Sequence, residues 1–447
     1  MKHPLLIFFI FSVISSNCQT ISTVAGNGVN AYVGDGGLAT NASIGGVGGI
    51  VFDHEGNYYI VENNFTIRKI STLGIISKYA GVGTMGYSGD GNSAILAQFQ
   101  DIGLLFVDSA DNLYVSDTHN NRIRKINSLT GIITTVIGNG NAGFSGDGGM
   151  ATSAEINAPI DVAFDNIGNL FFSDYFNYRI RKVSNTGIIS TIAGNGVKGW
   201  GNDGIPAIAT ELEGPYALKT DEEGNVYFSD INRIRKIDKN TGIVSTYVGV
   251  IDTSIGSFNC TGDGGLAVNA HTTMISDFIF DKFGNCFISD MNCDKIKIVD
   301  KYGYINTFAG TGNETFNGDG EPANSANLYS PRGIAIDSCG NLYISDNGHF
   351  RIRQVSFTKC NYLGIINPAI NRDISIYPNP TNDLFSIDNL KTHSTYRLLS
   401  IIGSVMQQGI LKEGNNNISI QIIPIGIYIM EIIDEENNKI MRKIVKQ

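Results

Sequence analysis

The feature that most constrains the fold is a set of four short signals that recurs six times in the same order. Each copy has a Gly-Asp-Gly or Asn-Asp-Gly tripeptide, a turn ending in Gly-Asn or Asp-Asn, an apolar segment ending in an acid, and an Ile-Arg-Lys-Ile-like segment. Successive centres of the last signal are 56, 57, 54, 62 and 56 residues apart. The tripeptide aspartates are Asp35, Asp90, Asp147, Asp203, Asp263 and Asp319; the turn asparagines are Asn57, Asn112, Asn169, Asn225, Asn285 and Asn341; the acids are Glu62, Asp117, Asp174, Asp230, Asp290 and Asp346; and the centres are Arg68, Arg124, Arg181, Arg235, Lys297 and Arg353. A fixed period of this length is typical of repeat architectures.

Each copy also contains four short strand candidates. In the third copy they are Asp161–Phe164, Asn169–Asp174, Tyr178–Val183 and Gly187–Ala193. These segments are rich in Ile, Val, Phe and Tyr and are bounded by Gly, Asn and Asp, as strands usually are. Four antiparallel strands per copy predict a propeller blade. A helical solenoid is disfavoured, because no copy offers a helical periodicity over ten or more residues.

The two ends of the repeat region predict how the ring closes. The sixth copy stops after its third strand, whereas residues 20–27 match the fourth strand of the later copies. We expect this N-terminal segment to complete the last blade, because closure removes an exposed sheet edge. The predicted fold is all-β: a six-bladed β-propeller over residues 19–360, followed by a small β-sandwich.

Composition excludes several other classes of protein. Glycine accounts for 53 of the 447 residues but lacks the every-third-residue spacing of collagen. A hydrophobic share of 42% with only 17% charged residues does not fit a disordered chain. The net charge of −10 and the absence of a basic block make nucleic acid a poor partner.

The N-terminus has the properties of an export signal. Residues 1–18 combine an early lysine, Lys2, with the apolar run from Leu5 to Ile14 and small residues near Cys18. This pattern predicts a secretory signal peptide that is cleaved after Cys18. No later segment has the length and hydrophobicity of a transmembrane helix.

The repeated motifs resemble a known family. A Gly-Asn-Leu-Tyr-Val-Ser-Asp-like strand followed by Asn-Arg-Ile-Arg-Lys resembles NHL repeats, and the loop from Gly138 to Pro159 resembles the subtype found in bacterial surface proteins and teneurin-like propellers. The resemblance covers about residues 20–358 and implies the propeller fold. Glu62, Lys297 and Asn202 depart from the repeated pattern. Since one propeller fold hosts many activities, the resemblance leaves the function open.

The C-terminal region is predicted to be a second domain. After a linker at 361–373, residues 374–447 resemble the type A sorting domain of type IX secretion in Bacteroidetes. The motif residues are Tyr377, Pro378, Asn379 and Pro380 at the start, Gly426 and Tyr428 in a later strand, and Lys443 near the end. The resemblance implies the type IX secretion machinery as a partner and a secreted or outer-surface location. The alternative is an additional adhesive β-domain.

The cysteines predict disulfides, because export leads to an oxidising environment. By blade register, Cys260 and Cys293 lie in loops on one face, and Cys339 and Cys360 lie on the opposite face. We predict the pairs Cys260–Cys293 and Cys339–Cys360, with Cys286 as a buried free thiol. The alternative is that all five cysteines beyond the signal peptide are unpaired.

The candidate site residues lie in the long loops that open each copy. The register puts the six tripeptide aspartates and the six strand-end acids on one face, where they suit a cation or ligand site. The structural alternative is that the tripeptide aspartates cap turns and that strand-end acids pair with arginines, such as Asp117 with Arg124, Asp174 with Arg181 and Asp230 with Arg235. Aromatic residues before the tripeptides are either ligand-stacking groups or packing plugs: Tyr32, Tyr87, Phe144, Trp200 and Phe316.

No catalytic constellation accompanies these loops. His119 and His349 occupy similar loops, but in the second and sixth copies, and a three-histidine zinc site is not visible. No cofactor is predicted, apart from the option of a structural cation. The expected function is therefore binding: a rigid secreted or surface propeller that recognises a protein or glycan through its loop face. The alternatives are a metal-dependent propeller enzyme, such as a lactonase-like hydrolase or a peptide-amidating lyase, and a structural surface component without a specific ligand.

Overall fold

The computed structural model of the chain describes residues 19–446, apart from 64, 252–259, 357–374, 378–380, 382, 391–392, 401–404, 425 and 435–438. The chain divides into two compact units, one up to residue 359 and the other from residue 360. The predicted signal peptide, the predicted linker and Cys360 lie outside the described residues.

The first unit contains six four-stranded antiparallel sheets among its described residues. The inner strands are β2 (Val47–Phe52), β6 (Ile102–Val107), β10 (Pro159–Phe164), β14 (Pro215–Thr220), β18 (Ile275–Phe280) and β22 (Pro331–Ile336). The second strands are β3 (Tyr58–Glu62), β7 (Leu113–Asp117), β11 (Leu170–Asp174), β15 (Val226–Asp230), β19 (Cys286–Asp290) and β23 (Leu342–Asp346). The third strands are β4 (Thr66–Ile70), β8 (Arg122–Ile126), β12 (Arg179–Val183), β16 (Arg233–Ile237), β20 (Lys295–Val299) and β24 (Arg351–Ser356).

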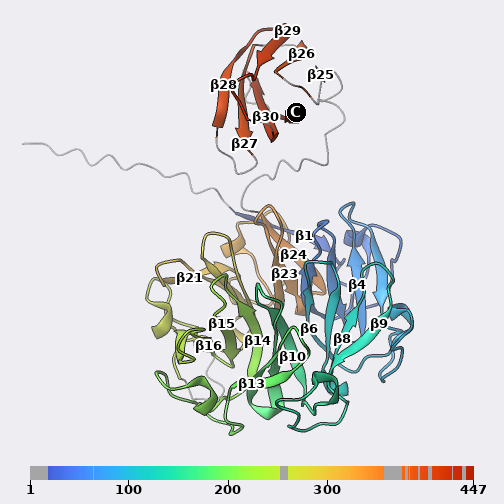
Figure 1. The fold of residues 1–447 in the computed structure, drawn as a ribbon, viewed down its shortest axis with the longest axis vertical. Helices are drawn as coiled ribbons and strands as arrows, with labels where there is room; N and C mark the ends of the chain where they lie inside the picture. Colours follow the sequence, from blue (N-terminus) through green and yellow to red (C-terminus); the bar gives the residue numbers. More distant parts are fainter. Residues whose placement is uncertain are drawn as a thin grey trace, which may run out of the picture. The chain divides into compact units, whose positions relative to one another are not determined.

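The outer strands are β5 (Ile76–Ala80), β9 (Ile133–Ile137), β13 (Ile189–Ala193), β17 (Val244–Val248), β21 (Ile305–Ala309) and β1 (Thr20–Ala25). Each inner strand contacts the inner strands of both neighbouring sheets, so the six blades form a closed ring. In Figure 1, β6, β10 and β14 lie near the middle of this ring, whereas β9, β13 and β21 lie near its edge. The six-bladed propeller predicted from the repeats is confirmed.

The ring closes through the two ends of the repeat region. Strand β1 pairs with β24 in the sheet β1-β24-β23-β22, with Ile21 opposite Val355. Ile21 is fully buried in a cluster with Leu328 and Ile344. The N-terminal strand thus completes blade six, as predicted, and contributes to its core.

The hydrophobic core lies between neighbouring blades. The second strands are buried along their whole length in blades one to five. One cluster combines Ile123 and Ile137 of blade two with Val162, Phe172 and Ile189 of blade three. Burying both faces of each sheet explains why these strands are nearly continuous apolar segments rather than strictly alternating ones.

A glycine is required where each outer strand ends. Gly138 has a φ of 90°, and a Cβ added there would clash with the carbonyl oxygen of Asn121. The same close approach to a backbone oxygen occurs in all six blades, at Gly26, Gly81, Gly138, Gly194, Gly249 and Gly310. Since glycine alone combines a positive φ with the absence of a Cβ, these positions account for the first glycine of the repeated Gly-Asn-Gly segments.

The long loop that opens each blade covers the blade's outer edge. In blade two, the Gly91 amide donates to the Ile133 carbonyl, and the Ile133 amide donates to Asn92. A short 3-10 turn then follows, at η1 (Ala39–Asn41), η2 (Ala94–Leu96), η4 (Ala151–Ser153), η6 (Ala207–Ala209), η7 (Ala267–Asn269) and η9 (Ala323–Ser325). Outer-strand groups that would otherwise lack a partner are satisfied in this way, which protects the edge from pairing with another chain.

The second unit contains two sheets, with strand orders β25-β26-β29 and β28-β27-β30-β31. Their bounds are β25 (Ser375–Tyr377), β26 (Leu384–Leu390), β27 (Ser394–Ser400), β28 (Val405–Leu411), β29 (Gly414–Ser419), β30 (Gly426–Asp434) and β31 (Lys439–Lys446). Phe385 of the first sheet and Leu398 and Met430 of the second belong to one buried cluster. The unit is thus the predicted small β-sandwich. Across the described residues, no helix has the length and apolar character needed to cross a membrane.

Candidate functional site

The tripeptide aspartates are held by buried cations. In blade two, Arg124 donates to Asp90 Oδ1 from Nε at 3.1 Å and from Nη2 at 2.8 Å. Its Nη1 donates to Asp117 Oδ2 at 3.4 Å. Arg124 and Asp117 are fully buried, whereas about a third of the Asp90 side chain is exposed. One guanidinium thus joins the opening loop to the end of the second strand; we call this unit of cation and two acids a bracket.

The bracket is repeated around the ring. The distance from the cation to the tripeptide aspartate is 2.7 to 3.0 Å in the six pairs Arg68–Asp35, Arg124–Asp90, Arg181–Asp147, Arg235–Asp203, Lys297–Asp263 and Arg353–Asp319. The strand-end acids of five blades lie 3.2 to 3.9 Å from the same cation: Glu62, Asp117, Asp174, Asp230 and Asp346. The predicted pairs across the second hairpin are therefore confirmed.

Blade five departs from this pattern because its cation is a lysine. Lys297 Nζ bonds Asp263 at 2.8 Å and Thr307 at 3.0 Å. Its strand-end acid, Asp290, instead accepts a hydrogen bond from the Thr273 hydroxyl at 2.5 Å. A single ammonium lacks the planar fork with which arginine serves two carboxylates, so the threonine supplies the missing donor.

In blade two, the pKa values of the two bracket acids shift in opposite directions. Burial raises the pKa of Asp117 to about 6, although Gln100, Asn120 and Arg124 donate to its carboxylate. Burial also acts to raise the pKa of Asp90, but hydrogen bonds from Thr135 and Arg124 outweigh it and hold that pKa below its ordinary value. The partly exposed aspartate is therefore the firmly ionised partner of the arginine.

The brackets keep the acids in separate blades. Each tripeptide aspartate lies beside the outer strand of its own blade, as where the Thr135 amide of β9 donates to Asp90. The acids at the ends of the second strands are fully buried. The twelve acids are therefore not gathered around the propeller axis, and their contacts are those of the structural alternative.

The aromatic residues before the tripeptides stack on arginines of the same blade. The distance from guanidinium carbon to ring centroid is 4.6 Å for Arg68 and Tyr32, 3.7 Å for Arg122 and Tyr87, and 3.7 Å for Arg179 and Phe144. The pairs Arg233–Trp200 and Arg351–Phe316 repeat the contact at 5.5 and 4.0 Å. Tyr32, Tyr87 and Phe144 remain 38%, 41% and 42% exposed. One side of each ring is thus fixed while part of the residue faces solvent.

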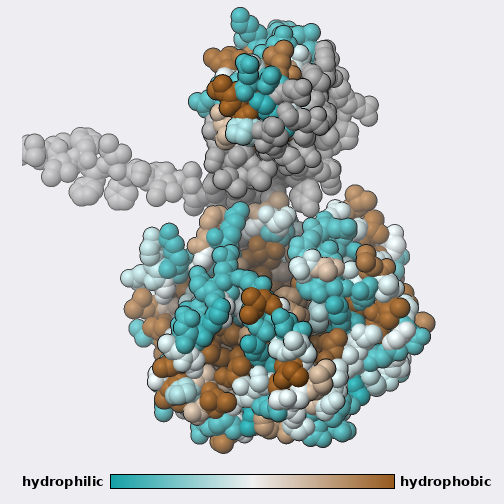
Figure 2. Space-filling view, viewed as in Figure 1, coloured by the Kyte–Doolittle hydropathy of each residue, from teal (hydrophilic) through white to brown (hydrophobic). Residues whose placement is uncertain are grey.

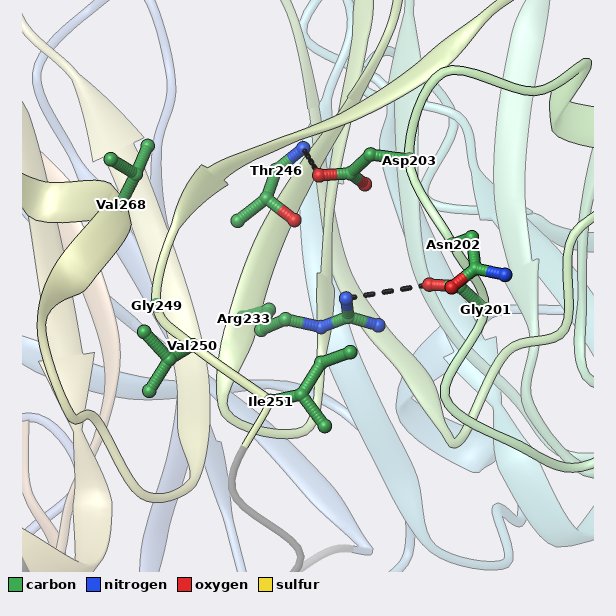
Figure 3. Close-up of a pocket in the computed structure, with 9 residues that line it drawn as sticks. All are labelled: Gly201, Asn202, Asp203, Arg233, Thr246, Gly249, Val250, Ile251 and Val268. Carbon is green, nitrogen blue, oxygen red and sulfur yellow. Dashed lines mark hydrogen bonds between the residues drawn. The ribbon is translucent and has the colours of Figure 1, made fainter.

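In blade four, the bracket borders a surface cleft of about 390 Å³. Figure 3 shows Arg233 between Asn202 on one side and Ile251 on the other, with Asp203 accepting a hydrogen bond from the Thr246 amide. The Arg233 guanidinium is already bonded to Asp230 and to the Gly201 carbonyl. The charged group in this cleft is therefore engaged by the protein itself.

The cysteines agree with the predicted arrangement where the structure describes them. Cys260 and Cys293 form a disulfide, as predicted, with their Cα atoms 6.0 Å apart. Cys286 is a buried free thiol, and burial raises its pKa well above the ordinary value. Cys339 is disulfide-bonded, and its predicted partner, Cys360, lies outside the described residues.

The potential metal ligands are mostly engaged with one another. Within the described residues, one group has metal-ligand spacing, Cys260, Cys293 and Asp290, and its two sulfurs are joined in the disulfide. His119 Nδ1 lies 3.1 Å from Asp101, and His349 Nδ1 lies 2.9 Å from Asp346. The two histidines are in η3 (Thr118–Asn120) and η10 (Asn347–His349), on blades two and six.

The central channel is a site that the sequence interpretation missed. A cavity of about 240 Å³ is lined by residues of all six inner strands, among them Gly48, Ile160, Tyr216, Ser276 and Arg332. These five residues and Gly103 of blade two are the second residues of the six inner strands, and together they form a ring around the channel. In contrast to the repeated bracket positions, this ring differs in every blade except blades one and two, and that variation was the available signal.

A buried ion cluster joins three inner strands. Lys219 of β14 bonds Asp161 of β10 and Asp277 of β18, each at 3.0 Å. The Leu218 amide donates to the Asp161 oxygen that also accepts from Lys219, and the Ile334 amide donates to the other oxygen of Asp277. The charges of this cluster are paired, and its carboxylates accept hydrogen bonds from the protein. We therefore interpret it as a structural link between blades three, four, five and six.

The sorting-motif residues lie in the second unit. Tyr377 is in β25, Gly426 and Tyr428 are in β30, and Lys443 is in β31. The Tyr428 hydroxyl donates to the Pro424 carbonyl at 2.6 Å. Pro378, Asn379 and Pro380 lie outside the described residues.

Comparison with family models agrees with this architecture. Residues 375–447 match the secretion system C-terminal sorting domain, residues 108–199 match the teneurin NHL domain, and residues 328–355 match the NHL repeat. Teneurin-1 of Gallus gallus is 26% identical over 404 residues, which cover 80% of this chain but 14% of teneurin-1. The chain thus spans a small part of the teneurins that it matches.

Solved structures share the fold. A Bacteroides thetaiotaomicron protein of unknown function has a TM-score of 0.56 and 19% identity, covering 76% of both chains. An auxiliary nutrient binding protein from Bacteroides ovatus has a TM-score of 0.55 and 14% identity, covering 75% of this chain and 76% of its own. At these identities the likeness concerns the fold alone.

The closed ring of six blades and these matches define the class of protein, a β-propeller built from NHL repeats. The chain is an NHL-type propeller followed by a C-terminal sorting domain. That domain marks it for type IX secretion to the cell surface or the extracellular space.

Proposed function

We propose that this secreted propeller is a binding protein, which recognises a protein or glycan through the long loops that open its blades. The observation that carries the proposal is the set of rings on three consecutive blades, Tyr32, Tyr87 and Phe144, each stacked on an arginine and still about two-fifths exposed. Trp200 and Phe316 extend the same surface to blades four and six.

The arginine stacking prepares these rings for binding. A ring that is already fixed loses little conformational entropy when a partner packs against it, so more of the contact energy appears as affinity. The Tyr87 hydroxyl is also held, because it donates to Asp90 at 2.9 Å. Aromatic groups of this kind suit both the apolar face of a sugar ring and the side chains of a protein partner.

The surrounding loops are apolar enough to form an interface. Val33, Leu38, Met85 and Leu96 are all more than half exposed on the opening loops of blades one and two. Figure 2 shows apolar residues interspersed with polar ones over the visible face of the propeller. Apolar side chains that stay exposed on a rigid scaffold favour an interaction surface. In this proposal, the six tripeptide aspartates form the acidic border of that surface.

The proposal is tested by measuring the binding of the purified chain to envelopes of a type IX-competent strain, to host cells and to a glycan array. Periodate treatment of the target removes binding if the ligand is a glycan, whereas protease treatment removes it if the ligand is a protein. Saturable binding abolished by one of these treatments supports the proposal. Absence of saturable binding to every target contradicts it.

A metal-dependent enzyme is the second function expected from the sequence. No observation in the described residues favours it specifically, because the one group with metal-ligand spacing contains a disulfide. Metal analysis of the purified chain separates the two functions. One stoichiometric, tightly held transition metal in the central channel would contradict a purely binding role.

A further inference from the structure

The central channel contains a cation without a partner among the described residues. Arg332 extends from β22 into the cavity of about 240 Å³ that all six blades line. Its Nε is buried without a hydrogen-bond partner, and no described residue forms a hydrogen bond or ion pair with its terminal guanidinium nitrogens. By contrast, Arg353, twenty-one residues later, has Asp346 and Asp319 on its terminal nitrogens. A guanidinium that faces a cavity without a partner among the described residues suits an anionic ligand, because arginine forms charge-assisted hydrogen bonds with carboxylates.

A phenol stands beside this cation. Tyr216 lines the same cavity, and its hydroxyl forms no hydrogen bond with the described residues. Arg332 and Asp101 line the same cavity as Tyr216. Burial is the main cause that raises the Tyr216 pKa to about 12, so the phenol is protonated at neutral pH. It is then a hydrogen-bond donor without an acceptor among the described residues.

A hydrogen-bond acceptor for a ligand lies at another part of the cavity wall. Asp101 lines the cavity, and its carboxylate lies 3.1 Å from His119 Nδ1 while about a third of its side chain stays exposed. A carboxylate in such a position accepts hydrogen bonds from hydroxyl groups. Ser276, in contrast, uses its hydroxyl on backbone carbonyls of Ser289 and Pro331, and so serves the wall itself.

We propose that the central channel binds a small hydroxylated carboxylate of the size of one sugar acid. The ligand's carboxylate lies on the Arg332 guanidinium and accepts the Tyr216 hydroxyl, and its hydroxyl groups donate to Asp101. Arginine forms the strongest and most directional of such contacts, because its fork matches a carboxylate. The cavity is smaller than the roughly 300–1,000 Å³ of pockets for drug-sized ligands, which excludes nucleotides and oligosaccharides.

Two features make this site independent of the proposed loop-face function. Tyr216 and Arg332 are on inner strands and Asp101 directly precedes β6, whereas the stacked rings come earlier in the opening loops, beside the outer strands. It is also asymmetric, since one arginine, one tyrosine and one aspartate come from three different blades. Binding of a macromolecular partner to the loop face and binding of a sugar acid in the channel can therefore fail separately. Each failure is measured by its own experiment.

The test is isothermal titration of the purified chain with galacturonate and glucuronate, with galactose, acetate and glycine as comparison ligands. We expect one saturable site for a sugar acid and at least tenfold weaker binding of the other three. Arg332→Gln is expected to weaken sugar-acid binding at least tenfold, because one charge-assisted contact is lost. Lys239→Gln removes a positive charge from an exposed position and is expected to change nothing.

A second variant keeps the test valid if Arg332→Gln fails to fold. Tyr216→Phe removes only the hydroxyl, which has no partner among the described residues, so the fold is expected to be unchanged and sugar-acid binding several-fold weaker. The proposal is overturned if the folded wild type binds neither sugar acid at millimolar concentration. It is also overturned if Arg332→Gln or Tyr216→Phe binds as tightly as wild type, or if acetate or glycine binds as tightly as the sugar acids.

Discussion

The guanidinium of Arg124 holds the carboxylate of Asp90 through two hydrogen bonds, although the two residues are 34 positions apart. The contact fastens a long opening loop to the third strand of the same blade. Because Arg124 is fully buried and also serves Asp117, the loop, the second strand and the third strand depend on one another. The first two predictions follow from this bracket.

Asp90→Asn is expected to lower the free energy of unfolding by about 1.5–3 kcal/mol at pH 7, the range for losing a hydrogen bond to a charged group. The Asp90 pKa is below its ordinary value of 3.8, so its stabilising effect is complete above that value and is lost as the pH falls through the folded-state pKa. The difference between wild type and variant should therefore shrink towards pH 3. Urea denaturation at pH 7 and pH 3 measures it, and an equal difference at both pH values would contradict the ion pair.

Arg353→Met is expected to lower the free energy of unfolding by about 3–5 kcal/mol, because it removes the permanently charged partner of the buried Asp346. Arg353→Lys should cost markedly less, since blade five already works with Lys297 and keeps the pair with its tripeptide aspartate at 2.8 Å. Chemical denaturation of the two variants provides the comparison. Equal losses in the free energy of unfolding would show that the planar shape of the guanidinium, and not its charge, provides the stability.

Gly138→Ala is expected to destabilise the propeller more than Gly148→Ala does. Both glycines have a φ between 84° and 90°, so both variants carry the strain of about 1–3 kcal/mol for such a conformation. Only at Gly138 does the added Cβ also meet a backbone oxygen, whereas Gly148 has open space around it. Thermal unfolding measures the difference, and equal melting temperatures would mean that the close approach to Asn121 is unimportant.

Removal of residues 375–447 is expected to abolish delivery of the propeller to the surface or medium of a type IX-competent strain, because these residues match the sorting domain. The propeller has its own core clusters, so it should remain folded inside the cell. Immunoblots of periplasm, surface and medium provide the measurement. Undiminished export of the truncated chain would assign the region to adhesion instead.

The strands and the ring closure were predictable from the sequence because they depend on local signals. Gly and Asn turns, apolar segments and a fixed period are all visible within one copy, and the match of residues 20–27 to later fourth strands identified the closing strand. The Cys260–Cys293 pair was predictable for a similar reason, since blade register puts both loops at one end of blade five.

The site was less predictable because it depends on contacts between distant segments. The pair Asp117–Arg124 spans one hairpin, but the third partner, Asp90, arrives through a loop that runs along the outer strand. The channel residues Tyr216 and Arg332 are 116 positions apart, and only closure of the ring brings them to one cavity. In the sequence, the channel site was indicated only by inner-strand positions that differ between otherwise matched copies.

The most direct test of the proposed binding role compares two sets of exposed aromatic residues. Tyr87→Ser with Phe144→Ser removes rings from the opening loops, whereas Phe283→Ser with Tyr302→Ser removes still more exposed rings that stack on lysines in the short hairpin turns of blade five. Surface plasmon resonance against the identified protein or glycan gives the two affinities. A loss of at least tenfold for the first pair with unchanged affinity for the second is the expected result, and equal affinities for both pairs would contradict recognition through the loop face.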